Sequence, residues 1–341
     1  KELYLIFIFV FILSVSISSN LVLEWDAAEV WIYKVINFYN NKGFQNLSGV
    51  PGDYTYPHLG SYIWSLFWNI SFVNAEYTGR IFYVFTYTLS ILLIINFKNI
   101  LPAIILTIGF YFLTLDYYLL SGYQEYLVFS FLIFIFYFYQ KYSENFNIYY
   151  LIPIFLFINT IIWFKNEATF FIIFFFIFIF SFSFFNKKKI KLEIFLLLFL
   201  FIISVLIKYY IFFKFFQSVN TGWLNYQINE IQNILNLAYF MERSSSILFS
   251  IFVAMIKCKT YLVFFITIIF FHKKKDIKIY TPFIIFMMMN IIFIYLIYYL
   301  TNDTSYKHYL ATTVDRLLFQ TSGIYLIAIM LIIKDKFIYF R

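Results

Sequence analysis

Two carboxylates and two tryptophans lie within nine residues directly after the first apolar run of the chain, in segment 23–31 (LEWDAAEVW). Tryptophan is enriched at the boundary between membrane and water. A short carboxylate at that boundary, Asp26, suits a general base that removes a proton from a hydroxyl beside a lipid-borne substrate. Helix capping is the alternative interpretation, because Asp is a favoured residue before a helix that would begin at Ala27.

The composition is that of an integral membrane protein. Of the 341 residues, 63% are hydrophobic and only 12% are charged, whereas charged residues make up about a quarter of a soluble domain. The net charge of +8 is expected to come from basic loops on one side of a membrane, so no nucleic-acid partner is predicted. Cys258 is the only cysteine, which excludes a disulfide within the chain.

Apolar runs long enough to cross a bilayer recur along the whole chain, and turn and strand signals are scarce. We therefore predict an all-α integral membrane protein, a single polytopic domain over residues 1–341 with about ten transmembrane helices. The predicted spans lie near 3–19, 77–97, 101–115, 124–139, 148–164, 168–185, 194–216, 247–271, 279–300 and 318–333. The short, Trp-rich segment 59–73 is expected to be interfacial or re-entrant instead.

Lysine clusters predict the orientation of these spans. The clusters at 187–191, 273–278 and 334–341 fall on one side of the ten-span arrangement, and cytoplasmic loops retain Lys and Arg. Both termini are therefore expected in the cytoplasm of a multi-pass plasma (inner) membrane protein. The first loop, about 20–76, is then extracytoplasmic, and its amphipathic segment 27–39 is predicted to form a juxtamembrane helix lying along the interface.

Polar residues in the loops of the extracytoplasmic side come from distant parts of the sequence. Ionisable groups at membrane depth are costly unless they face one another or water, so these loops are expected to build one polar cavity. Ordinary solvation of loops, and a local ion pair between Lys165 and Glu167, are the simpler alternatives. The candidate substrate-binding residues are Glu24, Lys34, Tyr56, His58, Glu125, Lys165, Glu167, His308 and Arg316.

Four short motifs along the chain carry a family resemblance. They are Glu24-Trp25-Asp26-Ala27 followed by Trp31, Lys34 and Tyr56-Pro57; GYQE at 122–125; KNE at 165–167; and HYLATTVDRLLFQ at 308–320. In this order they resemble the GT-C superfamily of polytopic membrane glycosyltransferases, of the protein O-mannosyltransferase and aminoarabinose transferase types. The sequence departs from the pattern at Glu125, where Asp is usual, at Ala168, where Gly is usual, and at Ala311-Thr312.

The resemblance implies a fold like that of GT-C proteins and transfer of a sugar, with inversion, from a polyprenyl-phosphate donor. The acceptor would be a lipid-linked or surface glycan, a lipid or a protein, and Asp26 would be the catalytic base. Arg316 is our first choice for contact with the lipid phosphate, because guanidinium matches phosphate oxygens. Glu24 and Asp26 are spaced so that they could together hold a divalent cation. A monophosphate leaving group has less need of a metal ion, so no metal and no cofactor is predicted.

Two other classes stay open as alternatives. A flippase or transporter of lipid-linked sugars would place charges within its spans and break helices near the midplane, whereas charges are expected to avoid the ten spans here. An O-antigen-type polymerase would carry a large extracytoplasmic loop rich in arginine, whereas segment 217–246 holds only Arg243. The sequence leaves open the sugar, the acceptor, the carrier lipid and the oligomeric state.

Overall fold

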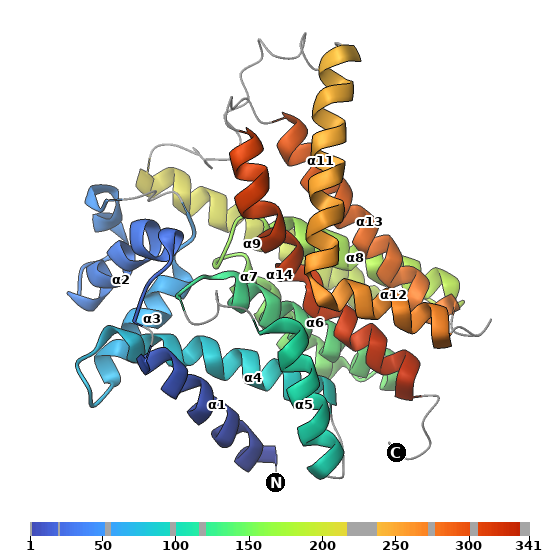
Figure 1. Ribbon diagram of the computed structural model, residues 1–341, viewed down its shortest axis with the longest axis horizontal. Helices are drawn as coiled ribbons and strands as arrows, with labels where there is room; N and C mark the ends of the chain where they lie inside the picture. Colours follow the sequence, from blue (N-terminus) through green and yellow to red (C-terminus); the bar gives the residue numbers. More distant parts are fainter. Residues whose placement is uncertain are drawn as a thin grey trace. The chain divides into compact units, whose positions relative to one another are not determined.

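The computed structural model of the chain is helical, and the residues that it describes contain no strand (Figure 1). These residues are 2–19, 21–51, 56–95, 100–115, 121–216, 237–271, 277–300 and 306–334. The prediction of an all-α protein is therefore confirmed for this part of the chain. The chain divides into two compact units, the first formed by 1–169, 192–219 and 339–341 and the second by 170–191 and 220–338.

The first unit is built around α6, which packs against α4 on one side and α7 on the other, while α1 lies along α4 (Figure 1). A helix that is apolar all round is expected in a core, and every residue of α6 from Glu125 to Phe136 is buried. The elements are α1 (Glu2–Ser19), η1 (Ala27–Trp31), α2 (Ile32–Tyr39), η2 (Phe44–Gly49), α3 (Leu59–Ile70), η3 (Glu76–Arg80), α4 (Ile81–Ile95), α5 (Ile100–Thr114), α6 (Glu125–Asn145), η5 (Ile148–Tyr150), α7 (Leu151–Ile161) and α9 (Leu192–Phe216).

The second unit is centred on α14, which contacts α11, α12 and α13. Its elements are α8 (Ala168–Phe185) without its first two residues, α11 (Leu237–Lys257), α12 (Lys259–Phe271), α13 (Ile277–Leu300) and α14 (Tyr306–Lys334). Aromatic rings join α8 to α13: the ring centroids of Phe178 and Phe283 lie 4.9 Å apart, and those of Phe170 and Phe293 lie 4.6 Å apart. Such ring pairs add to the stability that comes from burial alone.

Five helical stretches of the described chain are long and apolar enough to cross a membrane: Glu76–Ile95, Ala168–Phe185, Leu192–Phe215, Ile277–Leu300 and Leu310–Ile333. The pair α11 and α12 makes a sixth if it is counted as one span. Shorter apolar helices cover Tyr4–Ser19, Leu101–Thr114 and Ile148–Ile161. These helices agree with a multi-pass membrane protein, while the count of ten spans and the orientation stay predictions.

Two predicted spans differ from the helices observed. The segment 247–271 is not continuous: α11 and α12 meet at Cys258 with a bend of 79°, at the point where Lys257 and Lys259 interrupt the apolar run. The last helix begins twelve residues before the predicted start at 318, since α14 starts at Tyr306. Leu310, Val314 and Leu317 are buried at spacings of four and three, which continues one helical face through this segment.

The first loop is folded into helices of its own. The predicted helix 27–39 is present as η1, a π-helix, continued by α2, which ends at Tyr39 shortly before Asn41 adopts a positive φ of 57°. The segment predicted to be interfacial or re-entrant forms α3, whose 12 residues are too few to cross a bilayer. α2 and α3 pack against each other. This pair holds most of the candidate residues of the first loop.

Candidate functional site

The first loop docks onto two later turns of the first unit through backbone hydrogen bonds. The amide N of Glu24 donates to the carbonyl O of Ser121 over 3.3 Å, directly before the GYQE motif. The amide N of Leu59, the first residue of α3, donates to the carbonyl O of Trp163 over 3.1 Å, two residues before the start of the KNE motif at Lys165. Motifs that lie up to about 140 residues apart in the sequence are thereby neighbours in space.

Two glycines allow this close approach. A Cβ on Gly60 of α3 would lie 1.6 Å from Oε1 of Gln124, whose Nε2 donates to the hydroxyl of Tyr83 over 2.8 Å. Gly122 has a φ of +88°, which L side chains rarely adopt, and a Cβ there would lie 2.6 Å from the ring of Trp64. The GYQE segment is therefore packed tightly against α3.

Asp26 lies at the start of the π-helix η1. Its backbone is helical, with φ −63° and ψ −35°, and its side chain makes no capping hydrogen bond. The helix has already begun, because the amide N of Ala28 donates to the carbonyl O of Glu24 over 2.8 Å. The capping interpretation is therefore wrong. Glu24 and Asp26 are half-buried, and Trp25, which lies between them in the sequence, is exposed. π-Helical turns occur often at functional sites, which agrees with a role for Asp26.

Lys34 and Tyr56, both candidates from the sequence, are in contact. The Nζ of Lys34 donates to the carbonyl O of Tyr56 over 2.9 Å and lies 5.2 Å from the ring centroid of Trp31. The rings of Trp31 and Tyr56 meet edge to face at 5.8 Å. Lys34 is only 1% exposed, so a hydrogen bond and cation–π contacts hold a buried ammonium group beside η1.

His58 is surrounded by aromatic side chains. Its Nδ1 is buried and has no hydrogen-bond partner in the described part of the chain. Burial, and then the positive charges of Lys34 and Lys208, lower the pKa of its imidazole from 6.5 to about 3. The ring is therefore neutral at pH 7, and one of its nitrogens can accept a hydrogen bond. The rings around it are those of Phe38, Phe44, Trp163 and Phe212.

Lys165 joins two buried carboxylates. Its Nζ lies 2.7 Å from Oε1 of Glu125, at the start of α6, and 3.4 Å from Oε1 of Glu167. All three side chains are at most 7% exposed. The local ion pair expected between Lys165 and Glu167 is confirmed, and Glu125 joins it from the GYQE motif. The cluster links the turn after α7 to the core helix of the unit.

Lys208 was missed by the sequence analysis. It lies inside α9 and is 1% exposed, so the prediction that charges avoid the spans is wrong at this position. Its Nζ donates to the carbonyl O of Ile162 over 2.8 Å and to Oδ1 of Asn166 over 3.0 Å. The mean hydropathy of the predicted span stays high despite a single lysine, so this average does not reveal Lys208. The signal that was available is a lysine surrounded on both sides by apolar residues, the usual mark of a functional position in a span.

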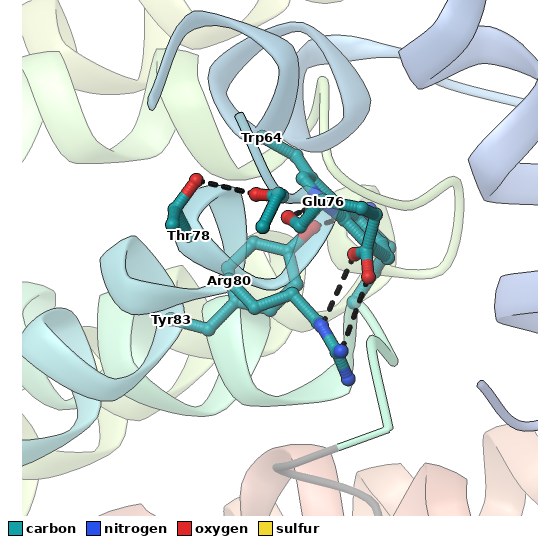
Figure 2. A network of polar contacts seen from close by, with 7 residues as sticks. Trp64, Glu76, Thr78, Arg80 and Tyr83 are labelled. Carbon is teal, nitrogen blue, oxygen red and sulfur yellow. Dashed lines mark hydrogen bonds and ion pairs between the residues drawn. The ribbon is translucent and has the colours of Figure 1, made fainter. Parts of the chain in front are cut away.

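Arg80 was also missed, and Figure 2 shows its surroundings. This fully buried guanidinium forms a bidentate ion pair with Glu76: Nε lies 3.1 Å from Oε1, and Nη2 lies 3.1 Å from Oε2. The indole N–H of Trp64 donates to the carbonyl O of Glu76 over 3.3 Å, and Thr78 donates to the hydroxyl of Ser71 over 3.0 Å. This network joins α3 to the start of α4 and so supports the docked first loop (Figure 2).

The remaining two candidates belong to the second unit. Arg316 is half-buried on the first half of α14, and its neighbour Asp315 accepts an exposed ion pair from Lys257 at 3.3 Å. His308 lies in the first turn of α14. Arg243, near the start of α11, is buried and donates through Nε and Nη2 to the carbonyl O of Tyr298 over 3.0 and 2.7 Å. Of the segment discussed for a polymerase, residues 217–236 lie outside the described residues.

Possible metal ligands are few within the described residues, where no three His, Cys, Asp or Glu side chains form a group. Glu125 and Glu167 are suitable ligand types for a divalent cation, but Lys165 contacts both of them. Glu24 and Asp26 are the other pair of carboxylates close in sequence.

No model of a protein family, no curated protein and no solved structure matches this chain. Function is therefore inferred from the residues of the chain and from their arrangement. Within the first unit, that arrangement gathers Asp26 and Glu24, the pair Lys34 and Tyr56, and His58 with the Lys165 cluster around the two docked turns.

Proposed function

We propose that the chain is an inverting membrane glycosyltransferase that moves a sugar from a polyprenyl-phosphate donor to a glycan, lipid or protein acceptor on the extracytoplasmic face. One observation carries the proposal: the first loop, with Asp26, is hydrogen-bonded to both turns that hold the GYQE and KNE motifs. Those segments are the ones that the resemblance to GT-C enzymes selects.

Asp26 acts as the general base in this proposal. The acceptor hydroxyl oxygen forms a bond to the anomeric carbon while the bond between that carbon and the phosphate oxygen breaks, which inverts the configuration. The electron pair of the broken bond leaves with the lipid phosphate, and the hydroxyl proton passes to the Asp26 carboxylate. General base catalysis of this kind contributes about 10²–10⁴-fold to a rate.

The other candidates position the two substrates. Lys34 is held by Tyr56 and Trp31, and Lys165 is held by Glu125 and Glu167, so these side chains would keep their places without being ordered by the ligand. Groups fixed in advance stabilise developing charge more effectively than mobile ones. In the proposal, Glu24 orients the acceptor.

Replacement of Asp26 tests the proposal. In the source organism, Asp26→Asn should lower glycan product at least 100-fold and raise the amount of polyprenyl-phosphate sugar, as measured by mass spectrometry of the extracted lipids. Glu29→Gln is the matched control, because Glu29 is an exposed carboxylate on the same π-helix. Normal glycan in cells that contain the Asp26→Asn protein at the usual level would reject the general base.

A transporter of lipid-linked sugars is the second candidate, and two observations favour it. Lys208 places a charge inside α9, and the break of 79° at Cys258 divides a candidate span into two helices, both of which transporters show. Purified protein in liposomes distinguishes the two functions. Movement of a labelled polyprenyl-phosphate sugar across the bilayer without covalent transfer to an acceptor would establish transport in place of glycosyl transfer.

A further inference from the structure

The second unit carries polar side chains inside two of the candidate membrane spans. Asn290 lies close to the middle of α13, and Thr321 lies close to the middle of the stretch Leu310–Ile333. The Nδ2 of Asn290 donates to the Oγ1 of Thr321 over 2.8 Å, and both side chains are at most 1% exposed. Lipid offers no hydrogen bonds at such a depth, so polar atoms there need partners within the protein or from a bound molecule.

Two tyrosines, from α12 and α14, lie beside this pair. The hydroxyl of Tyr261 donates to the carbonyl O of Leu318 over 3.0 Å and lies 3.0 Å from the Oγ1 of Thr321. Tyr325 follows Thr321 by one helical turn, and its ring centroid lies 4.7 Å from that of Tyr261. Both tyrosines are fully buried. We call Tyr261, Asn290, Thr321 and Tyr325 the mid-span cluster; it joins three helices of one unit.

The amide of Asn290 is only half satisfied by this cluster. Its Oδ1 is buried and accepts no hydrogen bond in the part of the chain that the structure describes. Turning the amide over would exchange its two ends and leave Nδ2 without an acceptor instead. In either orientation, one end of a buried amide lacks a partner, which is costly by about 1–3 kcal/mol in proteins. The amide therefore indicates a bound molecule that can form hydrogen bonds.

A second buried network of tyrosines shows that such a cluster can close without help. In the first unit, the hydroxyl of Tyr87 is hydrogen-bonded to the Oγ1 of Thr114 over 2.7 Å. The hydroxyl of Tyr111 donates to the Oγ1 of Thr88 over 2.9 Å. These side chains are at most 8% exposed, and each of their hydroxyls has a protein partner. The difference lies in the mid-span cluster and does not follow from burial alone.

We propose that the mid-span cluster binds one water molecule, which forms hydrogen bonds with the amide of Asn290 and with a tyrosine hydroxyl. The hydrogen bonds described for this cluster involve only neutral groups, so a cation buried there would meet no opposite charge. Water is neutral, is small enough for a fully buried site, and both donates and accepts. It therefore suits the amide in either orientation.

The bound water gives the second unit a polar point at the depth where lipid supplies none. A water that bridges buried groups is nearly as favourable as a direct hydrogen bond, so it completes the contact among α12, α13 and α14. The inference is independent of the proposed reaction, because it concerns one unit and no substrate.

X-ray radiolysis of the purified full-length protein in detergent tests the site. Millisecond pulses turn bound water into hydroxyl radicals, which add oxygen to neighbouring aromatic rings, and mass spectrometry locates the oxygen. Tyr261 or Tyr325 should take up oxygen about fivefold faster, or more, than Tyr87, which is equally buried but paired within the protein. All three rings are measured in the same sample, so this comparison needs no variant.

Two variants connect the label to the amide. Asn290→Leu should lower the rate at Tyr261 and Tyr325 to that of Tyr87, because leucine removes the polar partner of the water. Thr267→Val is the matched control and should label as wild type does. Thr267 is also buried on α12, but its hydroxyl donates to the carbonyl O of Val263 in its own helix over 2.7 Å.

Three results would overturn the inference. Equal wild-type rates at Tyr87 and at both tyrosines of the mid-span cluster would do so whether or not Asn290→Leu folds. Wild-type labelling in folded Asn290→Leu protein would do so as well. A thermal midpoint that rises in sodium chloride but not in choline chloride, and loses this rise in Asn290→Leu, would place a cation at the cluster instead of water.

Discussion

Lys165 and Lys208 are both buried, and both meet the turn that follows α7, yet their surroundings differ. Lys165 touches the carboxylates of Glu125 and Glu167, whereas Lys208 touches only a carbonyl and an amide oxygen. The first lysine belongs to an ion cluster that the protein completes by itself. The second is held in place without an acidic neighbour in contact. Two buried lysines of the first unit therefore differ in their contacts: one lies between two carboxylates, and the other donates to two neutral oxygens.

The largest effect is expected from Lys165→Met. Without the ammonium group, Glu125 and Glu167 would be left as two buried carboxylates close to each other. We expect the free energy of unfolding to fall by about 3–5 kcal/mol, the usual cost of removing one partner from a buried pair. Unfolding in mixed micelles measures it, with Lys141→Met, in a half-buried surface pair, as the control. A loss under about 1 kcal/mol would show that the cluster is not structural.

Low pH should reduce the stability of the protein through His58, whose imidazole is near Lys208. The pKa of His58 is about 3 in the folded protein, below its value of about 6.5 when unfolded, so the unfolded chain binds the proton first as the pH falls. Stability is therefore complete above pH 6.5 and is lost progressively toward pH 3. Between pH 7 and pH 5 we expect a loss of about 2 kcal/mol from this group. His58→Gln should flatten that part of the profile; an unchanged slope would contradict it.

Lys208→Met should change stability much less than the same substitution at Lys165. Two hydrogen bonds are lost, but the cost of burying a charge that hydrogen-bonds only to neutral groups disappears as well. The two terms oppose each other, and we expect a net change within about 1 kcal/mol. The same unfolding titration measures it. A loss as large as that of Lys165→Met would mean that Lys208 is part of the fold and would remove the distinction between the two lysines.

The smallest effect on stability is expected where the ion pair of a lysine is exposed to water. Lys257 and Asp315 of the second unit lie 3.3 Å apart, with side chains 64% and 37% exposed. Water screens such a pair, so Asp315→Asn should lower the free energy of unfolding by less than about 1 kcal/mol. This value sets the reference for an accessible lysine, and a larger loss would show that burial is not what separates the three lysines.

Long apolar runs made the helices predictable, because a run of apolar residues can satisfy its backbone only as a helix within a membrane. All ten predicted spans contain helix in the structure. The apolar runs did not predict where a helix is interrupted. The chain bends by 79° at Cys258, and α11 and α12 each pack against α14, a contact that is not local in sequence.

The candidate site was predictable in part. Motif order suggested that Glu24, Lys34, Tyr56, Glu125 and Lys165 belong together, and all of them lie in the docked region of the first unit. Lys208 escaped, because it is one charge in an apolar segment and its hydrogen-bond acceptors, Ile162 and Asn166, are distant in sequence. The Glu76 and Arg80 pair did carry a local signal, the spacing of four that joins opposite charges on a helix.

The π-helix η1 has a consequence for the direction of Asp26. A π-turn holds one residue more than an α-turn, so the helical register before Ala27 is offset from that of α2. If the same residues were wound as a regular α-helix, position 26 would turn by about 100° around the axis, whereas regular winding after deletion of one residue between Ala27 and Trp31 would leave its direction nearly unchanged. The extra residue of the π-turn therefore sets the direction of the Asp26 carboxylate relative to Trp31 and Lys34.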